Sequence, residues 1–333
     1  MAERRTAQEI LDLARLYQPA CVLTAAAALD VFSPLHAKPM TAEALAGELG
    51  TDPRATAILL DALAALKFLI KQGEQYSVPE DAAELLTEQS AENVLPMIRH
   101  MANAIRRWAE LPKIVQTGKC PELTPSIRGA GADMEAFIGG MNNISRPVAA
   151  GIMDKINPLR FRHMLDIGGG PGTWTIAFLH AADEAKATLF DLPAVIPIAR
   201  QQFAEAGLSD RVNLVGGDYN TDALPKGVDL AWLGAICHQN SRQQNRDLFT
   251  RTNAALSDEG VIVIRDVIMD CSRTSPPAGA LFAINMLVAT EGGGTYTFDE
   301  YSEDLRAAGF DEVTLVHKDE FMNSLIRAGK AKK

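Results

Sequence analysis

The stretch "LDIGGGPGTWTIAFL", residues 165–179, joins a short apolar run, a glycine-rich turn and an apolar stretch with helical spacing. Gly168, Gly170 and Gly172 let the backbone turn tightly and come close to a ligand at the start of a helix. This pattern is typical of the first strand, loop and helix of a doubly wound α/β sheet. It therefore predicts the fold of the second half of the chain and a ligand site within it.

Strand-like and helical segments alternate from about residue 160 onward. The strand-like runs are "HMLDIG", "ATLFD", "VNLVGG", "VDLAWLGAIC" and "GVIVIRDV". Alternation of this kind predicts an α/β fold, a doubly wound, mostly parallel sheet with helices on both faces. The tail "EVTLVHKDEFMNSLIRA" predicts two more strands close together in the sequence, the last of them antiparallel.

The first part of the chain, up to about residue 125, has helical spacing almost throughout. Thr41 and Asp52 are expected to cap two helices, and Gln72-Gly73-Glu74 predicts a hairpin turn. Helix, helix and hairpin make a winged-helix arrangement. Its second helix offers Ala, Leu and Ile where contacts with DNA bases need Arg, Asn or Gln, so we expect a packing or dimerisation role.

The expected division of the chain is as follows. Residues 1–100 form an all-helical, winged-helix-like dimerisation domain, and residues 101–333 form the ligand-binding domain with a helical linker over about 101–150. Across this boundary we expect a helical stretch over 92–118, followed by a linker or surface loop over 120–133, which is rich in Pro and Gly.

Composition limits the possible functions. The 333 residues are 47% apolar and 22% charged, with a net charge of −10, which disfavours a nucleic-acid partner. The N-terminus does not resemble a signal peptide, and the apolar run at 20–29 is too short for a membrane span. The four cysteines show no paired spacing, as expected of reduced thiols in the cytoplasm. The six histidines form no metal-binding motif, so we expect no bound metal. Because no apolar run is long enough for a membrane span, we also expect no membrane partner.

Three carboxylates at predicted strand ends indicate which cofactor the glycine loop binds. Asp166 ends the first strand, where a carboxylate suits a cationic amino-acid group better than a pyrophosphate. Asp191 ends the second strand, where an acidic residue accepts both ribose hydroxyls. Asp218 follows the third strand and is placed to reach an adenine amino group, with Tyr219 lying against the ring. A ligand with a ribose, an ammonium group and no phosphate fits this set, and S-adenosylmethionine is such a ligand.

The motifs also resemble those of a known family. In order along the chain they are "LDIGGGPG", "FDLPAVI", "GGDY", "ICH", "LSDEGVIVIRDVIMD" and "YTFDEYSEDLRAAGF". The sequence is similar in this order and spacing to the small-molecule O-methyltransferases, which include plant caffeic acid and flavonoid enzymes, bacterial tailoring enzymes and acetylserotonin methyltransferase. The resemblance covers nearly the whole chain. It implies a class I methyltransferase sheet, S-adenosylmethionine as cofactor, Leu192 beside Asp191 as a cofactor contact, and a homodimer formed through the N-terminal domain.

The resemblance places the catalytic base at His238, and the chemistry agrees. A phenol of pKa about 10 is protonated at neutral pH, and a neutral imidazole of pKa about 6.5 can take its proton. His238 follows a strand whose carboxyl end faces the ligand side of a doubly wound sheet. Asp266 closes the next strand and is expected to orient the imidazole. The alternative for Asp266 is an ordinary surface ion pair with Arg265 beside it.

The sequence departs from the family pattern around this histidine. Gln239-Asn240 replaces Asp-Trp of the plant enzymes, Gly234 replaces a lysine, and Thr295 stands where a second glutamate would be. We expect these positions to carry the difference in substrate. The resemblance also implies a substrate pocket lined by the following residues: Phe137, Met141, Asn142, Met286 and Thr295.

The sequence thus predicts methyl transfer from S-adenosylmethionine to a hydroxyl group of a small aromatic molecule. One alternative keeps this cofactor and changes the acceptor atom to carbon or nitrogen, because the histidine has one expected carboxylate partner where the family has two. Another is a non-catalytic, ligand-sensing winged-helix regulator, which the His238–Asp266 pair disfavours. A nicotinamide oxidoreductase is disfavoured by Asp166 and by Thr173, which replaces the last glycine of a dinucleotide fingerprint.

Overall fold

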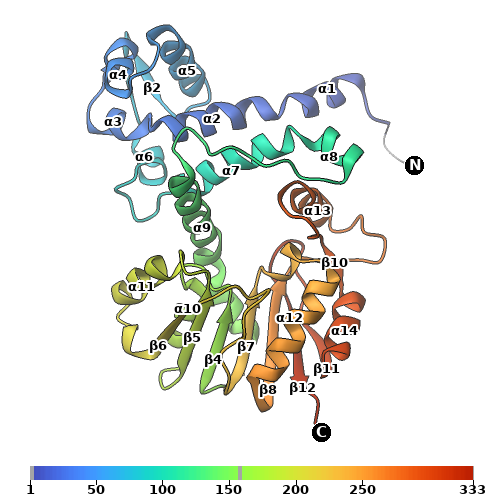
Figure 1. Ribbon diagram of the computed structural model, residues 1–333. Helices are drawn as coiled ribbons and strands as arrows, with labels where there is room; N and C mark the ends of the chain where they lie inside the picture. Colours follow the sequence, from blue (N-terminus) through green and yellow to red (C-terminus); the bar gives the residue numbers. More distant parts are fainter. Residues whose placement is uncertain (1–3, 157–159, 333) are drawn as a thin grey trace. The chain divides into compact units, whose positions relative to one another are not determined.

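The computed structural model describes residues 4–156 and 160–332. The chain divides into two compact units. The N-terminal unit runs up to Arg106 and includes Leu123–Asn143, and the C-terminal unit contains Arg107–Glu122 and the residues from Ile144 onward. The expected boundary near residue 100 stays a prediction. We describe each unit by itself (Figure 1).

The N-terminal unit is built from short helices around a small antiparallel sheet of strand order β1-β3-β2. Its elements are α1 (Ala7–Arg15), α2 (Tyr17–Leu29), α3 (Phe32–Ala37), β1 (Met40–Thr41), α4 (Ala42–Leu49), α5 (Pro53–Ala65), β2 (Ile70–Gln72), β3 (Gln75–Ser77) and α6 (Glu80–Leu86). The predicted caps are present, because the Thr41 hydroxyl accepts from the Ala44 amide and the Asp52 carboxylate from the Ala55 amide. The two helices and the hairpin that follows them lie where the sequence predicts them.

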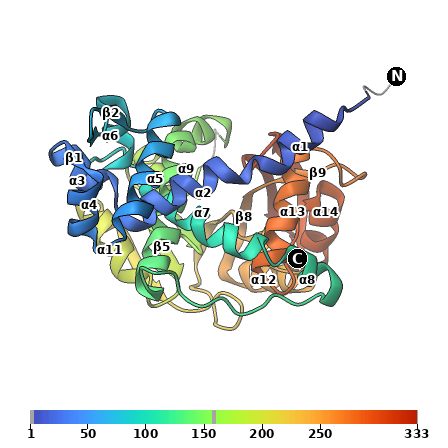
Figure 2. The same cartoon turned by 90° about the horizontal axis from the view of Figure 1, so that it is seen from above.

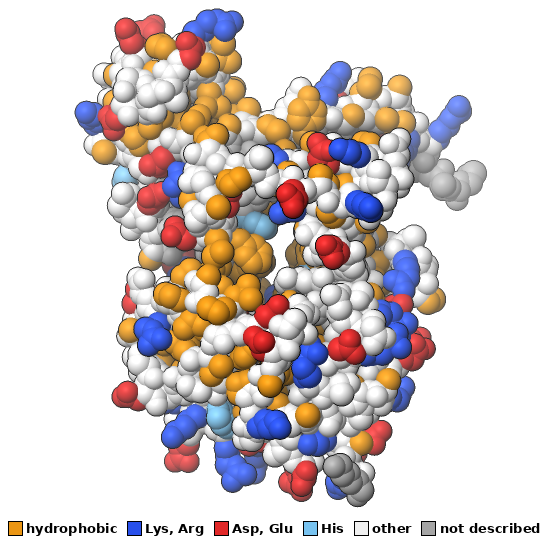
Figure 3. Space-filling view, viewed as in Figure 1, with side chains coloured by type: hydrophobic (Ala, Val, Ile, Leu, Met, Phe, Trp, Pro, Cys, Tyr) orange, Lys and Arg blue, Asp and Glu red, His pale blue; other side chains and the backbone are white. Residues whose placement is uncertain are grey.

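Helices α1 and α2 follow one another almost in line (Figures 1 and 2). Helix α1 has no buried residue, although one of its faces is strongly apolar. Its apolar side chains and those just after it are large and exposed: Ile10, Leu11, Leu13, Leu16 and Tyr17. Figure 3 shows apolar side chains at the surface of this arm. The arm therefore presents an apolar surface that its own unit does not cover.

The helical stretch expected over 92–118 consists of two helices. The structure has α7 (Leu95–Trp108) and α8 (Leu111–Thr117), separated by two residues. Pro112 lies in the first turn of α8 and has no amide hydrogen to donate to a preceding turn, so a new helix begins there. After α8 the chain forms the expected loop, but only to Gly129, because α9 (Ala130–Ile156) begins within the segment predicted as loop.

The C-terminal unit contains a seven-stranded sheet of order β11-β12-β8-β7-β4-β5-β6. Its strands are β4 (His163–Ile167), β5 (Lys186–Asp191), β6 (Val212–Gly216), β7 (Val228–Gly234), β8 (Leu256–Asp266), β11 (Phe310–His317) and β12 (Ser324–Lys330). Strands β4 to β8 pair in parallel, and β12 pairs antiparallel with both β8 and β11. The predicted doubly wound, mostly parallel sheet with an antiparallel last strand is confirmed.

Helices cover both faces of this sheet. The remaining elements are α10 (Thr173–Ala181), α11 (Ile196–Glu205), η1 (Ser209–Arg211), η2 (Cys237–Gln239), α12 (Arg242–Ala255), β9 (Ile268–Met269), α13 (Pro277–Ala289), β10 (Tyr296–Thr297) and α14 (Phe298–Ala307). One core layer joins the sheet to the end of α9 and to α10 and α11, and the other joins it to α12 and α14. Alternate residues of β8 contribute to the two layers, as the pleat of a strand requires.

The strand order reverses at β4, because β5 and β6 lie on one side of it and β7 and β8 on the other. Ligands of open α/β sheets bind at the carboxyl ends of the strands beside such a reversal. Strand β7 is shorter than the predicted run "VDLAWLGAIC", since it ends at Gly234. Ala235 follows with a left-handed φ of 62°, which turns the chain away from the strand direction and into η2.

Candidate active site

The glycine loop lies at the reversal point, between β4 and α10. Gly168, Gly170 and Gly172 have φ values of 67°, 55° and 89°, which residues other than glycine rarely adopt. A Cβ on Gly168 would lie 2.4 Å from the Ile236 Cδ1 atom, and one on Gly172 would lie 2.4 Å from the Phe203 ring. A Cβ on Gly170 would meet no atom within 4 Å. The loop is therefore packed at its two ends and open in the middle, where a ligand can approach the backbone.

Asp191 faces the middle of this loop from the end of β5. Its carboxylate accepts from the Gly170 amide and from the Leu192 amide, each at 2.7 Å. Burial raises the pKa of Asp191, and the two amide donors act in the opposite direction. Each carboxylate oxygen keeps a lone pair for a ligand hydroxyl. The Leu192 side chain beside it is 50% exposed and offers an apolar contact.

The segment after β6 reaches the same loop. The Tyr219 ring lies 3.6 Å from the position of a Cβ on Gly168, so it packs beside the glycine turn. Burial raises the pKa of Tyr219 to about 12, and the phenol is neutral at physiological pH. Asp218 is half-buried, and its carboxylate accepts from the Asn220 amide. The carboxyl ends of β4, β5 and β6 thus meet around one loop, as their sequence positions predict.

Asp166 lies beneath the loop. It is 1% exposed, and its carboxylate accepts a hydrogen bond from the Thr175 hydroxyl at 2.7 Å. Burial raises the pKa of Asp166 to about 7. The direct contact with a cofactor ammonium group stays a prediction, because in the structure this carboxylate supports the start of α10.

These residues suit a nucleoside better than a dinucleotide. An amide hydrogen in the middle of a glycine loop is the group that would bind a pyrophosphate, and here Asp191 already occupies that of Gly170. A carboxylate at this place also repels phosphate. The donor set therefore fits a ligand with ribose hydroxyls, an adenine ring and no phosphate.

His238 and Asp266 lie together at the carboxyl ends of β7 and β8. The His238 Nδ1 atom is 2.8 Å from a carboxylate oxygen of Asp266, and the His238 backbone amide donates to the other oxygen at 3.1 Å. The Val267 amide also donates to Asp266, at 2.8 Å. An ionised carboxylate only accepts, so Nδ1 carries the hydrogen and Nε2 has the free lone pair. The pair thus orients the imidazole so that Nε2 is the atom available to accept a proton.

The surroundings of the imidazole include a residue that the sequence did not indicate. The Phe282 ring on α13 packs edge-on against the His238 ring, with centroids 4.8 Å apart. Met286, which was expected in the substrate pocket, lies four residues later on the same helix and therefore on the same face. That spacing is the signal from which Phe282 could have been found.

A glycine segment crosses the backbone of the histidine. The Gly294 amide donates to the His238 carbonyl at 2.9 Å. A Cβ on Gly293 would lie 2.5 Å from that same carbonyl oxygen, whereas one on Gly294 would have 3.9 Å to its nearest atom. Thr295, the next residue, is 5% exposed, and its carbonyl accepts from the Arg273 guanidinium at 3.0 Å.

Two positions that distinguish this sequence from the family pattern have structural partners. Asn240 is 3% exposed and donates to Asn245, while its carbonyl accepts from the Tyr296 hydroxyl. A Cβ on Gly234 would lie 2.6 Å from the Trp232 indole nitrogen. Asn240 therefore fixes the turn that carries His238. A residue larger than glycine at position 234 would clash with the Trp232 ring.

Arg265 does not form the surface ion pair considered from the sequence. It is 3% exposed, and it donates to the Asn323 amide oxygen through Nε and Nη2, at 3.0 and 2.7 Å. The Asp266 side chain lies on the opposite face of the sheet, with His238, so its carboxylate bonds to the imidazole and not to Arg265.

The expected pocket residues are divided between the two units. Phe137, Met141 and Asn142 lie on α9 in the N-terminal unit, where the Phe137 ring contacts His100. Met286 and Thr295 lie in the C-terminal unit. A joint pocket of these five residues stays a prediction.

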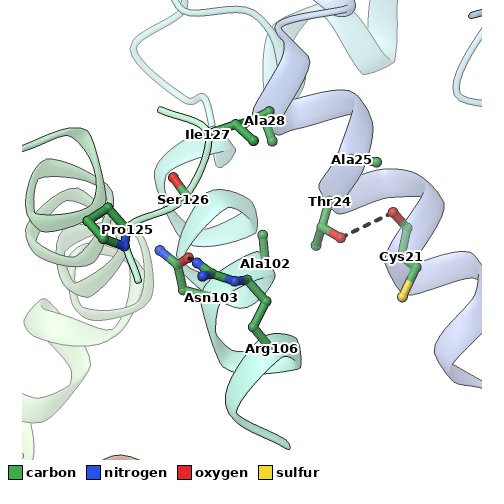
Figure 4. A pocket seen from close by; sticks show the side chains of 10 residues that line it. All are labelled: Cys21, Thr24, Ala25, Ala28, Ala102, Asn103, Arg106, Pro125, Ser126 and Ile127. Carbon is green, nitrogen blue, oxygen red and sulfur yellow. Dashed lines mark hydrogen bonds between the residues drawn. The ribbon is translucent and has the colours of Figure 1, made fainter. Parts of the chain in front are cut away.

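The N-terminal unit has a cleft of its own. It is about 350 Å³ in volume and lies between α2, α7 and residues 125–127. Figure 4 shows Arg106 and Asn103 side by side in this cleft, and Arg106 donates to Asn103 and to the Thr124 carbonyl. Its polar groups are thus bonded within the unit.

Over residues 4–156 and 160–332, no group of three or more His, Cys, Asp or Glu side chains could hold a metal ion. Among the described residues no helix is long and apolar enough to cross a membrane.

A seven-stranded sheet with a glycine loop after its first strand, an acidic residue at the end of the second and a histidine after the fourth is typical of Rossmann-like domains that bind nucleotides or nucleosides. Comparison with known proteins is more specific. Residues 126–311 match the O-methyltransferase domain, and residues 11–88 match the O-methyltransferase dimerisation domain. The chain belongs to this O-methyltransferase family.

Known relatives match almost the full chain. The tetracenomycin polyketide synthesis 8-O-methyl transferase TcmO of Streptomyces glaucescens is 29% identical over 92% of this chain and 91% of its own. The 3-hydroxy-5-methyl-1-naphthoate 3-O-methyltransferase of Streptomyces sahachiroi is also 29% identical, over 92% and 90%. The crystal structure of human N-acetylserotonin methyltransferase in complex with SAM matches with a TM-score of 0.82 and 26% identity, over 100% of both chains.

Relatives that transfer to other atoms also match. The N,N-dimethyltransferase OxyT of Streptomyces rimosus and the L-tyrosine C(3)-methyltransferase of Streptomyces lavendulae are each 26% identical. The match to OxyT covers 91% of this chain and 90% of OxyT. The match to the tyrosine methyltransferase covers 88% of this chain and 83% of that enzyme.

Proposed function

We propose that this protein transfers a methyl group from S-adenosylmethionine to a hydroxyl group of a small aromatic molecule, with His238 as the general base. The observation that carries the proposal is the His238–Asp266 pair, which leaves Nε2 as an acceptor at the carboxyl edge beside the glycine loop. The family supports the reaction class, and the O-methylating relatives named above support the hydroxyl acceptor.

The residues around the loop would hold the cofactor. Asp191 would accept the two ribose hydroxyls, Leu192 and Tyr219 would contact the adenine, and Asp218 would accept from its amino group. The open backbone at Gly170 would lie against the amino-acid part. When bound, S-adenosylmethionine supplies an electrophilic methyl group on a sulfonium.

His238 acts on the acceptor. Its Nε2 takes the proton of the hydroxyl as that oxygen becomes a nucleophile, and the Asp266 carboxylate stabilises the imidazolium that forms. General-base help of this kind contributes about 10²–10⁴-fold to a rate. Holding the acceptor in line contributes more, about 7–11 kcal/mol when the geometry is right. Phe282 limits how the imidazole can rotate.

The alternative acceptors use the same site. A ring carbon next to a phenol is also activated when the phenol loses its proton to His238, and an amine needs its proton removed in the same way. The relatives that methylate nitrogen and carbon support keeping these alternatives. A regulator without catalysis would bind the cofactor and leave it unchanged.

We also propose a homodimer formed through the N-terminal unit, working in the cytoplasm. Residues 11–88 match a dimerisation domain, and the exposed apolar face of α1 and the cleft beside α2 are surfaces that a second copy would cover. The four cysteines are free, as in a reducing compartment. Light scattering after size exclusion measures the mass directly, and a monomer at micromolar concentration would contradict the dimer.

The function is tested in two steps. Calorimetry with S-adenosylmethionine and with NAD comes first, and binding of NAD alone would reject the proposal. A screen with S-adenosylmethionine labelled on its methyl group then covers phenols, quinols and polyketides. The position of the label in the product, read by NMR, distinguishes oxygen from nitrogen and carbon. Cofactor binding without transfer to any member of the screen would support the regulator.

A further inference from the structure

Arg265 is a buried cation with no carboxylate partner. It lies at the end of β8 and is 3% exposed. Among the described residues no Asp or Glu oxygen lies within 4.0 Å of its guanidinium, and its only side-chain hydrogen bonds are the two to the Asn323 amide oxygen. Burial lowers the pKa of Arg265 to about 10, so the group stays charged at neutral pH. The Asp266 and Asp319 carboxylates are near enough to favour its charge, but neither makes a direct ion pair with it, and buried charges are usually paired directly.

The guanidinium is held in one place by an aromatic ring. It lies over the Trp174 ring, 4.5 Å from the centroid, and Trp174 packs on Trp232 with centroids 5.2 Å apart. Asn323 fixes its Nε and Nη2 edge. The Nη1 group is therefore the part of the guanidinium that remains available to donate to another acceptor.

A second donor near Arg265 also lacks an acceptor. The Trp232 indole nitrogen is fully buried and makes no hydrogen bond within the described part of the chain. A Cβ on Gly234 would lie 2.6 Å from this nitrogen and 3.3 Å from Trp174, so both rings pack over the glycine. Gly234 is the register partner of Arg265 in the β7–β8 pair. A cation and an N–H group that lacks an acceptor thus lie in one cluster around Gly234.

This cluster adjoins the glycine loop. Trp232 pairs in register with Asp166, the residue two before Gly168. Trp174 is the second residue of α10, and the next residue, Thr175, bonds to Asp166. The unpaired donors therefore lie directly beside the loop against which the amino-acid part of the cofactor would rest.

We propose that Arg265, held by Trp174 and Asn323, binds the α-carboxylate of the methyl donor. This inference rests on the proposed function, because it needs S-adenosylmethionine as the ligand. The cofactor carries one carboxylate, which is the anion that the cluster lacks. A guanidinium fork binds a carboxylate well, and the Trp232 N–H in the same cluster is a second donor without an acceptor.

The inference is tested by binding, without turnover. The probes are S-adenosylhomocysteine, which keeps the α-carboxylate, and its decarboxylated form, which keeps the amino group and lacks the carboxylate. We expect the wild type to bind the first more tightly. In Arg265→Met the affinity for S-adenosylhomocysteine should fall by about ten- to a hundredfold, the worth of a charged hydrogen bond. The affinity for the decarboxylated form should stay the same.

Arg327→Met is the matched control, because Arg327 is an exposed arginine on the neighbouring strand β12 and its loss changes the net charge equally. Equal losses for both ligands in Arg265→Met, or no loss for either, would overturn the inference. If the wild type binds neither ligand, the proposed function fails instead. Should Arg265→Met not fold, Asn323→Ala releases the guanidinium, and unchanged affinity for S-adenosylhomocysteine in that variant would overturn the inference equally.

Discussion

Arg265 and Asp266 are consecutive residues at the end of one strand, and both are charged and almost completely buried. Their surroundings differ. Asp266 accepts from three N–H groups, two of them on His238, whereas Arg265 has one neutral amide oxygen and an aromatic ring. Because side chains alternate across a strand, the two residues lie on opposite faces of the sheet. One face is complete without a ligand, and the other has unused donors.

The difference indicates a division of labour at the end of β8. In the proposed function the Asp266 face would set the tautomer and orientation of the base, and its contacts form without a ligand. The Arg265 face is proposed to recognise an anion, which would be its first direct ion pair. Changes on the first face should therefore act on the rate, and changes on the second should act on binding.

The largest expected effect is on the Asp266 face. His238→Ala should lower the rate of methyl transfer by about 10²–10⁴-fold, because the proton acceptor is lost. The affinity for S-adenosylhomocysteine should be unchanged, since the residue contacts the acceptor. Single-turnover kinetics and calorimetry measure the two quantities, and an unchanged rate would remove His238 from the mechanism.

Asp266→Asn should lower the same rate by about tenfold to a hundredfold, which corresponds to one charged hydrogen bond. The amide can donate to Nδ1 and so favour the wrong tautomer of His238. Single-turnover kinetics measures the rate, and an unchanged rate in a folded variant would show that Asp266 does not position the base.

Gly234→Ala tests the Arg265 face. The new Cβ would lie 2.6 Å from the Trp232 nitrogen and 3.3 Å from Trp174, so we expect a loss of about 1–3 kcal/mol in the free energy of unfolding. The affinity for S-adenosylhomocysteine should fall, because the methyl group displaces the Trp232 and Trp174 rings, and Arg265 lies on the second of them. Urea denaturation and calorimetry measure both. Gly294→Ala is a control with room for its Cβ, and equal effects of the two changes would contradict the packing argument.

Asp166→Asn, on the Arg265 face, is expected to change the pH dependence of stability and not the reaction. The pKa of Asp166 is raised from 3.8 to about 7 by burial. Between these values the folded state binds a proton that the unfolded state does not, so stability is highest below pH 4 for this group and falls as pH rises to 7. One unit of pKa shift corresponds to about 1.4 kcal/mol. The asparagine keeps an acceptor for Thr175 and should flatten this pH dependence, which thermal unfolding at pH 5 and pH 8 measures.

Much of the fold was predictable because its signals are local. Thr41 and Asp52 cap their helices as expected, and the three glycines of the loop have left-handed φ values that only their residue type tolerates well. The site followed from the rule that parallel strands end at one edge, which placed Asp191, Tyr219 and Gly168 around one loop.

The remainder depends on side-chain directions that spacing does not contain. Arg265 was considered as a surface partner of Asp266 because the two are adjacent, yet the pleat places them on opposite faces. Phe282 reaches His238 from a helix more than forty residues later, and no local pattern joins them. Ala235 ends β7 early because its backbone is left-handed, and an alanine in the sequence does not predict that conformation.

The glycine segment over His238 also bears on how this protein could be given a new acceptor by laboratory evolution. A Cβ on Gly293 would lie 2.5 Å from the His238 carbonyl oxygen, so any side chain at this position would displace His238 or the glycine segment. Gly294 contacts the same carbonyl through its amide alone, and a side chain on it would enter free space. A library that varies Gly294 and keeps Gly293 would therefore change the lining near the acceptor while the catalytic histidine stays in place.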